Sequence, residues 1–349
     1  MKCTIQNIAD HLGLSRNTVS KALKNSSEVS ENTRNLVIKT ASKLGYKNAT
    51  FATPVIPASE TGSNGTILFL TRTYASDSEF WTTVLRGIES ILSNANYHLA
   101  INIMSDSDLK QLNFPQTISD SSIKGIILVE ICDKVVCDAL SQFNLPIVSV
   151  DMPNVPFEEL NGIDVVTMES KKNLKKIINQ LIEKGAESFG FVGDLYSPNV
   201  SRGFQERYNA LSECLAEHQL PLNQKNCLLH QTPEDFRNFQ TTVNNLQAMI
   251  SLPDVFICGN DWTAIQLIYA LQFLGFQIPK DICVVGFDNI PAASRISPSL
   301  TTISTPQKYL GIAAARQILE RIQHPNCPHV FCQYETELII RNSTNIISF

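Results

Sequence analysis

The sequence predicts a small all-α helix-turn-helix head followed by an α/β core of two doubly wound parallel-sheet lobes. Three observations support this prediction. Two short helical patterns flank Gly13 near the start, a Pro- and Ser-containing segment follows at residues 51–64, and β-rich runs then alternate with helical ones. At 349 residues and 43% hydrophobic composition, the chain can form about two to three domains with substantial cores.

The first element is a helix predicted over residues 5–11. Its apolar residues recur at helical spacing directly after Thr4, a residue type that caps helix N-termini. Gly13 ends this helix, because glycine readily adopts the left-handed backbone that terminates helices. The pattern therefore predicts a short amphipathic helix followed at once by a tight turn.

The second helix presents residue types that read DNA. Leu14 and Val19 flank its N-cap and can form a hydrophobic staple that sets the entry angle of the chain. With Val19, Ala22 and Leu23 turned inward, the opposite face is polar and carries Ser15, Arg16, Asn17, Ser20 and Lys21. Arginine can bind guanine, asparagine can bind adenine, and serine and lysine suit base edges or phosphates. A solvated polar face is the alternative interpretation.

A third helix, capped by Ser30, completes the predicted head. The residues expected on its inward face are Leu36, Val37, Thr40, Ala41 and Leu44. Residues 1–50 hold eight Lys and Arg against three Asp and Glu, a charge of +5, so the remainder carries −10 of the total −5. A basic head is steered toward phosphate while an acidic body avoids it, which indicates that the body has another task.

The core is expected to begin after a linker. Pro, Ser, Thr and Gly interrupt the periodicity before residue 65, and two series of β-rich and helical runs follow. The first series comprises residues 66–70, 80–95, 98–103, 125–129, 134–143 and 146–150. The second comprises residues 163–168, 171–183, 189–192, 205–217, 227–230, 234–249, 255–258, 262–274 and 282–287. Two such lobes form a cleft at the carboxyl ends of their strands, where open sheets bind small ligands.

The sequence shows no catalytic, metal or cofactor motif. It has no Gly-x-Gly-x-x-Gly after a strand, no phosphate-binding loop, no Gly-x-Ser-x-Gly and no Cys-x-x-Cys among its nine cysteines. We therefore expect no cofactor, no metal and no enzyme activity. An enzyme would have Asp151, Asp261 and Asp288 as acid–base groups, and a solute-binding protein for transport is the other alternative. With no apolar leader or spanning run, the expected location is cytoplasmic.

Many short motifs match one known family. In the head they are Thr4-Ile5, Ile8-Ala9, Gly13-Leu14-Ser15, Thr18-Val19-Ser20-Lys21, Val29-Ser30, Thr33-Arg34 and Leu44-Gly45-Tyr46. In the body they include Leu85-Arg86-Gly87-Ile88-Glu89, Gly259-Asn260-Asp261, Val284-Val285-Gly286-Phe287-Asp288 and Pro298-x-Leu300-Thr301-Thr302. The chain resembles the lactose-repressor/galactose-repressor (LacI/GalR) family of bacterial transcription regulators.

The resemblance implies a homodimeric repressor that binds a pseudo-palindromic operator. Its core would resemble type I periplasmic binding proteins and close on a small effector, a sugar or sugar phosphate. The implied domains are a head at 1–50, a linker at 51–64 and a core at 65–349. Within the core, the N-subdomain would span about 65–160 plus 291–322, and the C-subdomain about 161–290 plus 323–349.

The resemblance also implies site residues. For DNA they are Thr4, Ser15, Arg16, Asn17, Thr18, Ser20, Lys21, Lys24, Thr33, Arg34, Tyr46 and Val55. For the effector they are Phe80, Trp81, Asp151, Arg207, Asn260 and Asp288. Arg202 is the alternative to Arg207 as the arginine that binds the effector. Asn260 and Asp288 could instead serve as turn or N-cap residues. Phe80 or Trp81 could instead pack in the hydrophobic core.

The chain departs from the family pattern in its linker and before one core helix. Asn48-Ala49 replaces the usual Pro-Asn, and Thr53-Pro54-Val55 stands where Arg-Ser-Leu is usual. Because Pro54 removes a helical hydrogen bond, we predict an atypical or absent hinge helix, with Val55 or Ile56 as the apolar wedge for the minor groove. Ala210 replaces a glycine after Arg207, and Met168-Glu169-Ser170 replaces an Asp-Asn pair.

Overall fold

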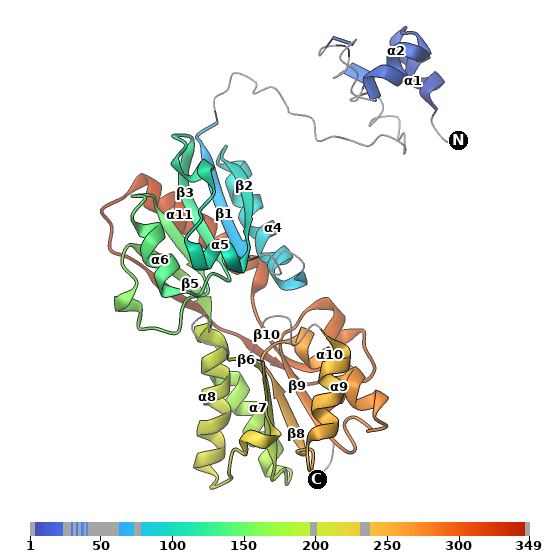
Figure 1. Ribbon diagram of the computed structural model, residues 1–349, viewed down its shortest axis with the longest axis vertical. Coiled ribbons are helices and arrows are strands. Elements are labelled where there is room, and N and C mark those ends of the chain that lie inside the picture. Colours follow the sequence, from blue (N-terminus) through green and yellow to red (C-terminus); the bar gives the residue numbers. More distant parts are fainter. Residues whose placement is uncertain are drawn as a thin grey trace. The chain divides into compact units, whose positions relative to one another are not determined.

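A computed structural model of the protein (Figure 1) describes residues 4–23, 29–30, 33, 36–37, 40, 63–72, 78–195, 201–230 and 238–345. The chain divides into two compact units, Met1–Gly62 and Ser63–Phe349. Among the helices described, none combines the length and the apolar character that a membrane crossing requires.

The head contains the predicted helix-turn-helix. Helix α1 (Ile5–Leu12) and helix α2 (Arg16–Leu23) are joined by Gly13, whose φ of +64° lies in the left-handed region. A small apolar core forms where the helices meet, and it contains Ile8, Ala9, Val19, Ala22, Val29 and Val37. The prediction that Leu36 faces inward is wrong, because its side chain is 50% exposed while the adjacent Val37 is fully buried.

The first lobe is a parallel six-stranded sheet with the strand order β11-β5-β4-β3-β1-β2. Its strands are β1 (Thr66–Arg72), β2 (His98–Met104), β3 (Ile123–Val129), β4 (Ile147–Val150), β5 (Ile163–Met168) and β11 (Phe331–Tyr334). Its helices are α4 (Glu79–Asn94), α5 (Asp106–Gln111), α6 (Lys134–Ser141) and α11 (Gln307–Gln323). Short 3-10 turns lie at η2 (Gln116–Ser119) and η3 (Phe157–Glu159).

The second lobe is a six-stranded sheet with the order β12-β10-β9-β8-β6-β7, parallel except for β12. Its strands are β6 (Phe189–Asp194), β7 (Leu228–His230), β8 (Val255–Cys258), β9 (Cys283–Asp288), β10 (Thr301–Ser304) and β12 (Glu337–Ile339). Its helices are α7 (Lys172–Glu183), α8 (Arg202–Glu217), α9 (Phe239–Ala248) and α10 (Asp261–Phe273). The 3-10 turns are η4 (Gln224–Asn226), η6 (Pro291–Ser294) and η7 (Asn342–Thr344). Two parallel-sheet lobes are thus confirmed.

The chain passes between the lobes three times, and this corrects the predicted subdomain boundaries. Strand β5, assigned to residues 161–290 of the second lobe, pairs with β4 in the first sheet. Strand β11, assigned to 323–349 of the second lobe, pairs with β5, whereas β10, assigned to the first, pairs with β9 in the second. Local sequence patterns predict strands but not their partners, and β11 pairs with residues far away in the chain.

Apolar burial on both sheet faces explains why the strands read as continuous hydrophobic runs. In β1 and β3 nearly every side chain is buried, as expected of parallel strands covered by helices on both sides. Helices α4 and α11 pack so closely that a Cβ on Gly311 would lie 2.0 Å from the Val84 carbonyl oxygen. Glycine is therefore required where these helices touch.

Candidate functional site

The outer face of α2 is the candidate DNA-binding surface. Ser15 caps the helix by accepting a hydrogen bond from the Thr18 backbone N–H at 3.0 Å, and the Ser15 and Thr18 hydroxyls are 2.8 Å apart. Val19 and Ala22 are buried against α1. The exposed residues are Ser15, Arg16, Asn17 and Lys21, and Thr18 and Ser20 are partly exposed. Helix packing therefore turns the predicted base-reading side chains outward.

The other predicted DNA contacts lie at the ends of the head helices or beyond the described part. Thr4 is exposed and caps α1 in a reciprocal capping box with Asn7. Thr33 is partly exposed, and its hydroxyl lies 2.8 Å from that of Ser30. Outside the described residues lie Lys24, Arg34, Tyr46 and Val55, together with the linker.

Three charged residues stand side by side at the carboxyl edge of the first sheet. The strand register aligns one residue each from β1, β3 and β4, namely Thr71, Val129 and Val150. The residues that follow them, Arg72, Glu130 and Asp151, are therefore neighbours on strands about 4.8 Å apart. Glu130 and Asp151 have φ angles of +58° and +86°, a left-handed backbone that L residues rarely adopt and that clusters at functional sites.

Glu130 is a buried acid that reasoning from sequence missed. Burial raises the pKa of its carboxyl to about 7, although a hydrogen bond from the Trp81 side chain and the charge of Arg72 oppose the rise. Its Oε2 atom is buried and has no hydrogen-bond partner among the described residues. The sequence did contain one signal for Glu130. It directly follows the strand that ends at Val129, just as Asp151 directly follows the strand that ends at Val150.

Asp151 and the aromatic pair lie near Glu130. Asp151 Oδ1 accepts a hydrogen bond of 2.8 Å from the Met152 N–H, and burial raises the pKa of its carboxyl. Phe80 and Trp81 are both buried in the core and meet edge to face at 4.6 Å between centroids. Of the two, Trp81 contacts Glu130, so it is the one that reaches the charged groups.

Asp288 is the corresponding acid at the carboxyl edge of the second sheet. It is the last residue of β9 and has a φ of +117°. Its carbonyl oxygen accepts hydrogen bonds from Gln307 Nε2 at 2.6 Å and Thr305 Oγ1 at 3.2 Å. Burial raises the pKa of its carboxyl well above the usual range, with Arg207 opposing the rise. Thr305 and Gln307, on the segment that crosses into the first lobe, therefore hold the backbone of Asp288 in place. The sequence did not reveal this role of Gln307.

Asn260 and Asp261 have clear structural roles beside this edge. Asn260 is the N-cap of α10, and its Oδ1 accepts the Thr263 N–H at 2.8 Å, which is the alternative role considered for it. Asp261 is fully buried, and its two oxygens accept the Thr302 hydroxyl at 2.5 Å and the Ile290 N–H at 2.9 Å. Burial raises the pKa of Asp261 to about 6. Asp261 thus anchors the loop after β9 from within the core.

Arg207 is the buried cation between the lobes. Its side chain donates a hydrogen bond of 2.6 Å from Nη1 to the Gly259 carbonyl, and its guanidinium carbon lies 3.7 Å from the Phe287 ring centroid. It is 3% exposed, and its Nε has no partner among the described residues. Burial lowers its pKa, while Asp288 and Asp151 oppose the fall. Arg202 instead pairs with Glu206 at 2.8 Å.

Acids from both sheets therefore converge between the lobes. Glu130 and Asp151 come from the first sheet, Asp194 and Asp288 from the second, and each interacts electrostatically with at least one acid of the opposite lobe. We call these four residues the interlobe acids. The lobes also touch directly, since the Arg202 N–H donates to the Met152 carbonyl at 3.0 Å. Among the residues described, no cluster of three or more side chains suits a metal ion.

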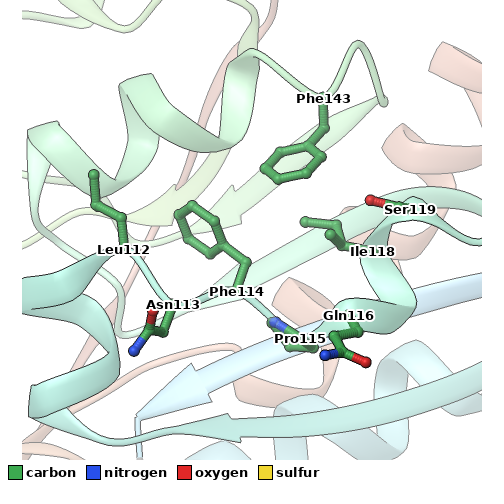
Figure 2. A pocket seen from close by; sticks show the side chains of 8 residues that line it. All are labelled: Leu112, Asn113, Phe114, Pro115, Gln116, Ile118, Ser119 and Phe143. Atoms are coloured by element: carbon green, nitrogen blue, oxygen red, sulfur yellow. The ribbon is translucent and has the colours of Figure 1, made fainter.

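A separate pocket of about 490 Å³ lies at the opposite edge of the first sheet. Figure 2 shows the segment after α5 and Phe143 lining this pocket. The ring centroids of Phe114 and Phe143 are 5.6 Å apart, and the rings meet edge to face. The lining contains no titratable side chain. Because it flanks the amino ends of β3 and β4, this pocket is distinct from the interlobe acids at their carboxyl ends.

Two family models match the chain. One, described as bacterial regulatory proteins of the lacI family, matches residues 4–48, which cover the helix-turn-helix. The other, a periplasmic binding protein-like domain, matches residues 178–344, which cover most of the second lobe and its crossings.

Similar proteins span nearly the whole chain. A "HTH-type transcriptional repressor PurR" of Photobacterium profundum is 26% identical over 97% of this chain and 98% of its own length. A "Ribose operon repressor" of Haemophilus influenzae is 27% identical over 97% of this chain and 98% of its own length. Among solved structures, a lac repressor dimer bound to operator and an anti-inducer covers 99% of both chains with a TM-score of 0.66 at 19% identity. A transcriptional regulator CelR–cellobiose complex covers 98% of this chain and 100% of its own with a TM-score of 0.68 at 19% identity.

Proposed function

We propose that the chain is a member of the LacI family of bacterial regulatory proteins, a transcriptional repressor whose operator affinity is controlled by a small effector bound between its two core lobes. It acts as a DNA-binding regulator rather than as an enzyme. Its site of action is the cytoplasm, because that is where a bacterial operator is found.

One observation carries this proposal: a helix-turn-helix with an outward polar face is joined to a core of two parallel-sheet lobes. Arg16, Asn17 and Lys21 are exposed on α2. Arginine and asparagine can each make bidentate contacts to a base edge in the major groove. The basic charge of residues 1–50 adds the phosphate attraction on which operator search depends.

We propose residues 1–50 as the head, 51–64 as the linker and 65–349 as the core. A compact unit that begins at Ser63 supports this division. Lys24, Arg34 and Tyr46 complete the proposed DNA contacts, with Val55 as the linker wedge in the minor groove.

The effector site we propose is built on the interlobe groups. Asp151, Arg207 and Asp288 interact with one another electrostatically, and Trp81 joins them through Glu130. Asn260 adds its amide beside the Gly259 carbonyl that Arg207 binds. Phe80 supports Trp81 from the core. The ribose operon repressor and the cellobiose-bound regulator among the similar proteins favour a sugar-like effector.

Control of DNA binding follows from how the lobes are connected. Three chain crossings join them, and one of these, at Thr305 and Gln307, holds the backbone of Asp288. A ligand that binds Asp288 and Asp151 together favours one arrangement of the lobes. Only a difference in ligand affinity between two arrangements can change operator occupancy.

The exposed apolar surface fits a homodimer. Helix α10 is apolar on all sides, yet Tyr269 and Phe273 are 43% and 69% exposed on one face of it. On the edge strand β2, Ile101 and Ile103 are also about half exposed. Exposed apolar groups at these two places indicate surfaces that a second copy covers. A dimer brings two heads to the two half-sites of a palindrome.

Selection of bound sequences from a random DNA pool tests the proposal. The full-length protein is incubated with the pool at fixed salt, with and without a panel of sugars, and bound DNA is sequenced. We expect one palindromic sequence to be enriched and its recovery to change with one compound. Binding without sequence preference would refute the proposal, since phosphate attraction alone gives non-specific binding.

Two head variants separate base reading from phosphate binding. Arg16→Ala should weaken the preferred site by roughly 1–3 kcal/mol and relax preference at one base, whereas Lys2→Ala should weaken all sequences about equally and lower the salt slope by about 1. Arg295→Ala, which removes an exposed arginine outside the head, serves as the control. Equal losses on all sequences for Arg16→Ala would remove it from base reading.

A further inference from the structure

Arg207 is a buried cation that no neighbouring acid neutralises by direct contact. Its side chain is 3% exposed, and it forms no ion pair within the part of the chain that the structure describes. Its Nη1 atom donates to the neutral Gly259 carbonyl, and the Phe287 ring packs against its guanidinium. Buried charges are normally paired, because an unpaired one is costly. Arg207 is therefore suited to bind an anionic group of a ligand.

The acids around Arg207 either have other partners or resist ionisation. The acids whose charge acts on Arg207 are Asp288, Asp151, Glu206 and Asp261. Glu206 pairs with Arg202 at 2.8 Å, and Asp261 accepts hydrogen bonds from the loop after β9 and from β10. Burial raises the pKa of the Asp151 and Asp288 carboxyls, so both ionise less readily than an exposed aspartate. The guanidinium therefore keeps a positive charge that these acids do not fully balance.

Two other arginines near the interlobe acids have contacts of their own. Arg72 forms an ion pair of 2.6 Å with Asp106. Arg341 donates hydrogen bonds of 2.6 and 2.8 Å to a side-chain oxygen and a carbonyl oxygen of the second lobe. Arg207 is thus the arginine of this region that is best able to accept an anionic ligand.

The start of helix α8 places further polar groups beside Arg207. Gly203 is the second residue of α8. A Cβ built on it would lie 3.3 Å from Arg207 Nη2 and 3.5 Å from both Ser170 Oγ and Ser201 Oγ. Ser170 is 1% exposed, and neither its hydroxyl nor Arg207 Nε has a hydrogen-bond partner among the described residues. The guanidinium and the Ser170 hydroxyl therefore lie within reach of one ligand group.

A carboxylate suits these donors better than a hydroxyl or a phosphate does. Nε and Nη2 of Arg207 lie on the same side of the planar guanidinium and form a fork that matches the two oxygens of a carboxylate. The Ser170 hydroxyl adds a third donor, and the N-terminus of a helix favours a negative charge. One carboxylate balances the single charge of Arg207, whereas a doubly charged phosphate would leave excess negative charge buried beside Asp151 and Asp288.

We propose that the effector is a sugar acid whose carboxylate binds the Arg207 guanidinium and the Ser170 hydroxyl at the start of α8. This inference rests on the proposed function, since it names the chemical class that the effector site selects. The sugar hydroxyls bind Asp151 and Asp288, whose carboxyls can accept hydrogen bonds. Neutral sugars and sugar phosphates bind this site more weakly.

Matched compounds test the proposal directly. Two sets differ at a single carbon: glucuronate, glucose and glucose-6-phosphate, and galacturonate, galactose and galactose-6-phosphate. Gluconate and sorbitol form a third, open-chain pair. Binding to the full-length protein is measured by calorimetry and thermal shift at one pH and one salt concentration. We expect the acid of at least one set to bind at least about tenfold more tightly than its neutral and phosphorylated counterparts.

Three variants locate the bound carboxylate. Ser170→Ala removes one donor and should weaken binding of the acid about tenfold while changing the neutral sugar little. Arg207→Lys keeps the charge but loses the fork, and it should weaken the acid by at least about tenfold. Gly203→Ala puts a methyl group between the donors and should exclude the acid without loss of stability, because alanine favours helices and its nearest neighbours lie 3.3 Å away or more. Ser93→Ala, at an exposed serine that bonds within α4, is the control.

Tighter binding of a neutral sugar or a sugar phosphate than of the matched acid would overturn the inference, as would acid binding that Ser170→Ala or Gly203→Ala leaves unchanged. Failure of every acid to bind, while DNA selection still yields an operator, would reject this effector class and leave operator binding standing. Failure of DNA selection as well would reject the proposed function itself.

Discussion

Replacing Asp164 by Asn should destabilise the core strongly, because Asp164 and Arg321 form a buried clamp on the loop that joins α11 to β11. Their side chains are 0% and 5% exposed. Arg321 donates to both Asp164 oxygens, at 2.8 and 3.0 Å, and its remaining donors bind the carbonyls of Pro325, Cys327 and Pro328. The clamp therefore ties the end of α11 and the loop after it to β5.

The magnitude follows from what the substitution leaves behind. Asn keeps the size of Asp164 but removes its charge, and Arg321 remains buried with carbonyl oxygens as its other partners. Removing one partner of a buried ion pair costs about 3–5 kcal/mol. The Val330 N–H and the Gln317 amide, at 2.8 and 3.1 Å from Asp164, also depend on its oxygens.

Urea unfolding followed by tryptophan fluorescence measures this loss. The chain has two tryptophans, Trp81 on α4 of the first lobe and Trp262 on α10 of the second. The fluorescence signal therefore reports unfolding of the two-lobed domain. Glu213→Gln breaks exposed pairs with Lys171 and Lys175 and should cost less than about 1 kcal/mol. A loss below about 1 kcal/mol for Asp164→Asn would refute the assignment of a clamp.

The pH dependence of the same variant gives an independent check. Burial acts to raise the pKa of Asp164, but hydrogen bonds from Arg321, Gln317 and Val330 outweigh it, so the pKa is lowered. A carboxyl with a lowered folded-state pKa contributes stability above its unfolded pKa of about 3.9 and loses it as pH falls through the folded value. The difference between wild type and Asp164→Asn should therefore be largest near neutral pH and shrink below about pH 4.

Three further substitutions test the packing, the loop anchor and the dimer surface. Gly311→Ala should separate α4 from α11 and lower stability by about 1–3 kcal/mol, because the added Cβ would lie 2.0 Å from a carbonyl oxygen; an unchanged urea midpoint would contradict this contact. Asp261→Asn should cost about 1–3 kcal/mol by mispairing the Ile290 N–H or the Thr302 hydroxyl, and equal stability of the variant would argue against an anchoring role. Phe273→Asp should shift sedimentation from dimer to monomer, whereas Ile250→Asp, a more exposed site outside the proposed interface, should not.

Local features of the chain were predictable from sequence because they depend on neighbours within a few residues. Thr4, Gly13 and Ser15 mark the head helices through capping chemistry that acts over one turn. Most core elements were predicted to within a few residues of their bounds, since their apolar runs are buried by helices on both sides. Elements after residue 287 were not predicted from periodicity, and α11 and β11 are among them.

The site was only partly predictable for the same reason. The family resemblance indicated Asp151, Arg207 and Asp288, and the positions of Asp151 after β4 and Asp288 at the end of β9 agree with it. Glu130 was missed because its significance depends on β3 lying between β1 and β4, which no local pattern specifies.

The sequence by itself determined the helix-turn-helix, the alternation of strands and helices, and the resemblance to the LacI family. Only the tertiary structure decided which lobe receives β5, β10 and β11, and that acids from two sheets meet between the lobes. The physical reason is that propensity and periodicity act over a few residues, whereas strand pairing and the burial of charge depend on segments that lie far apart in the chain and meet only in the folded protein.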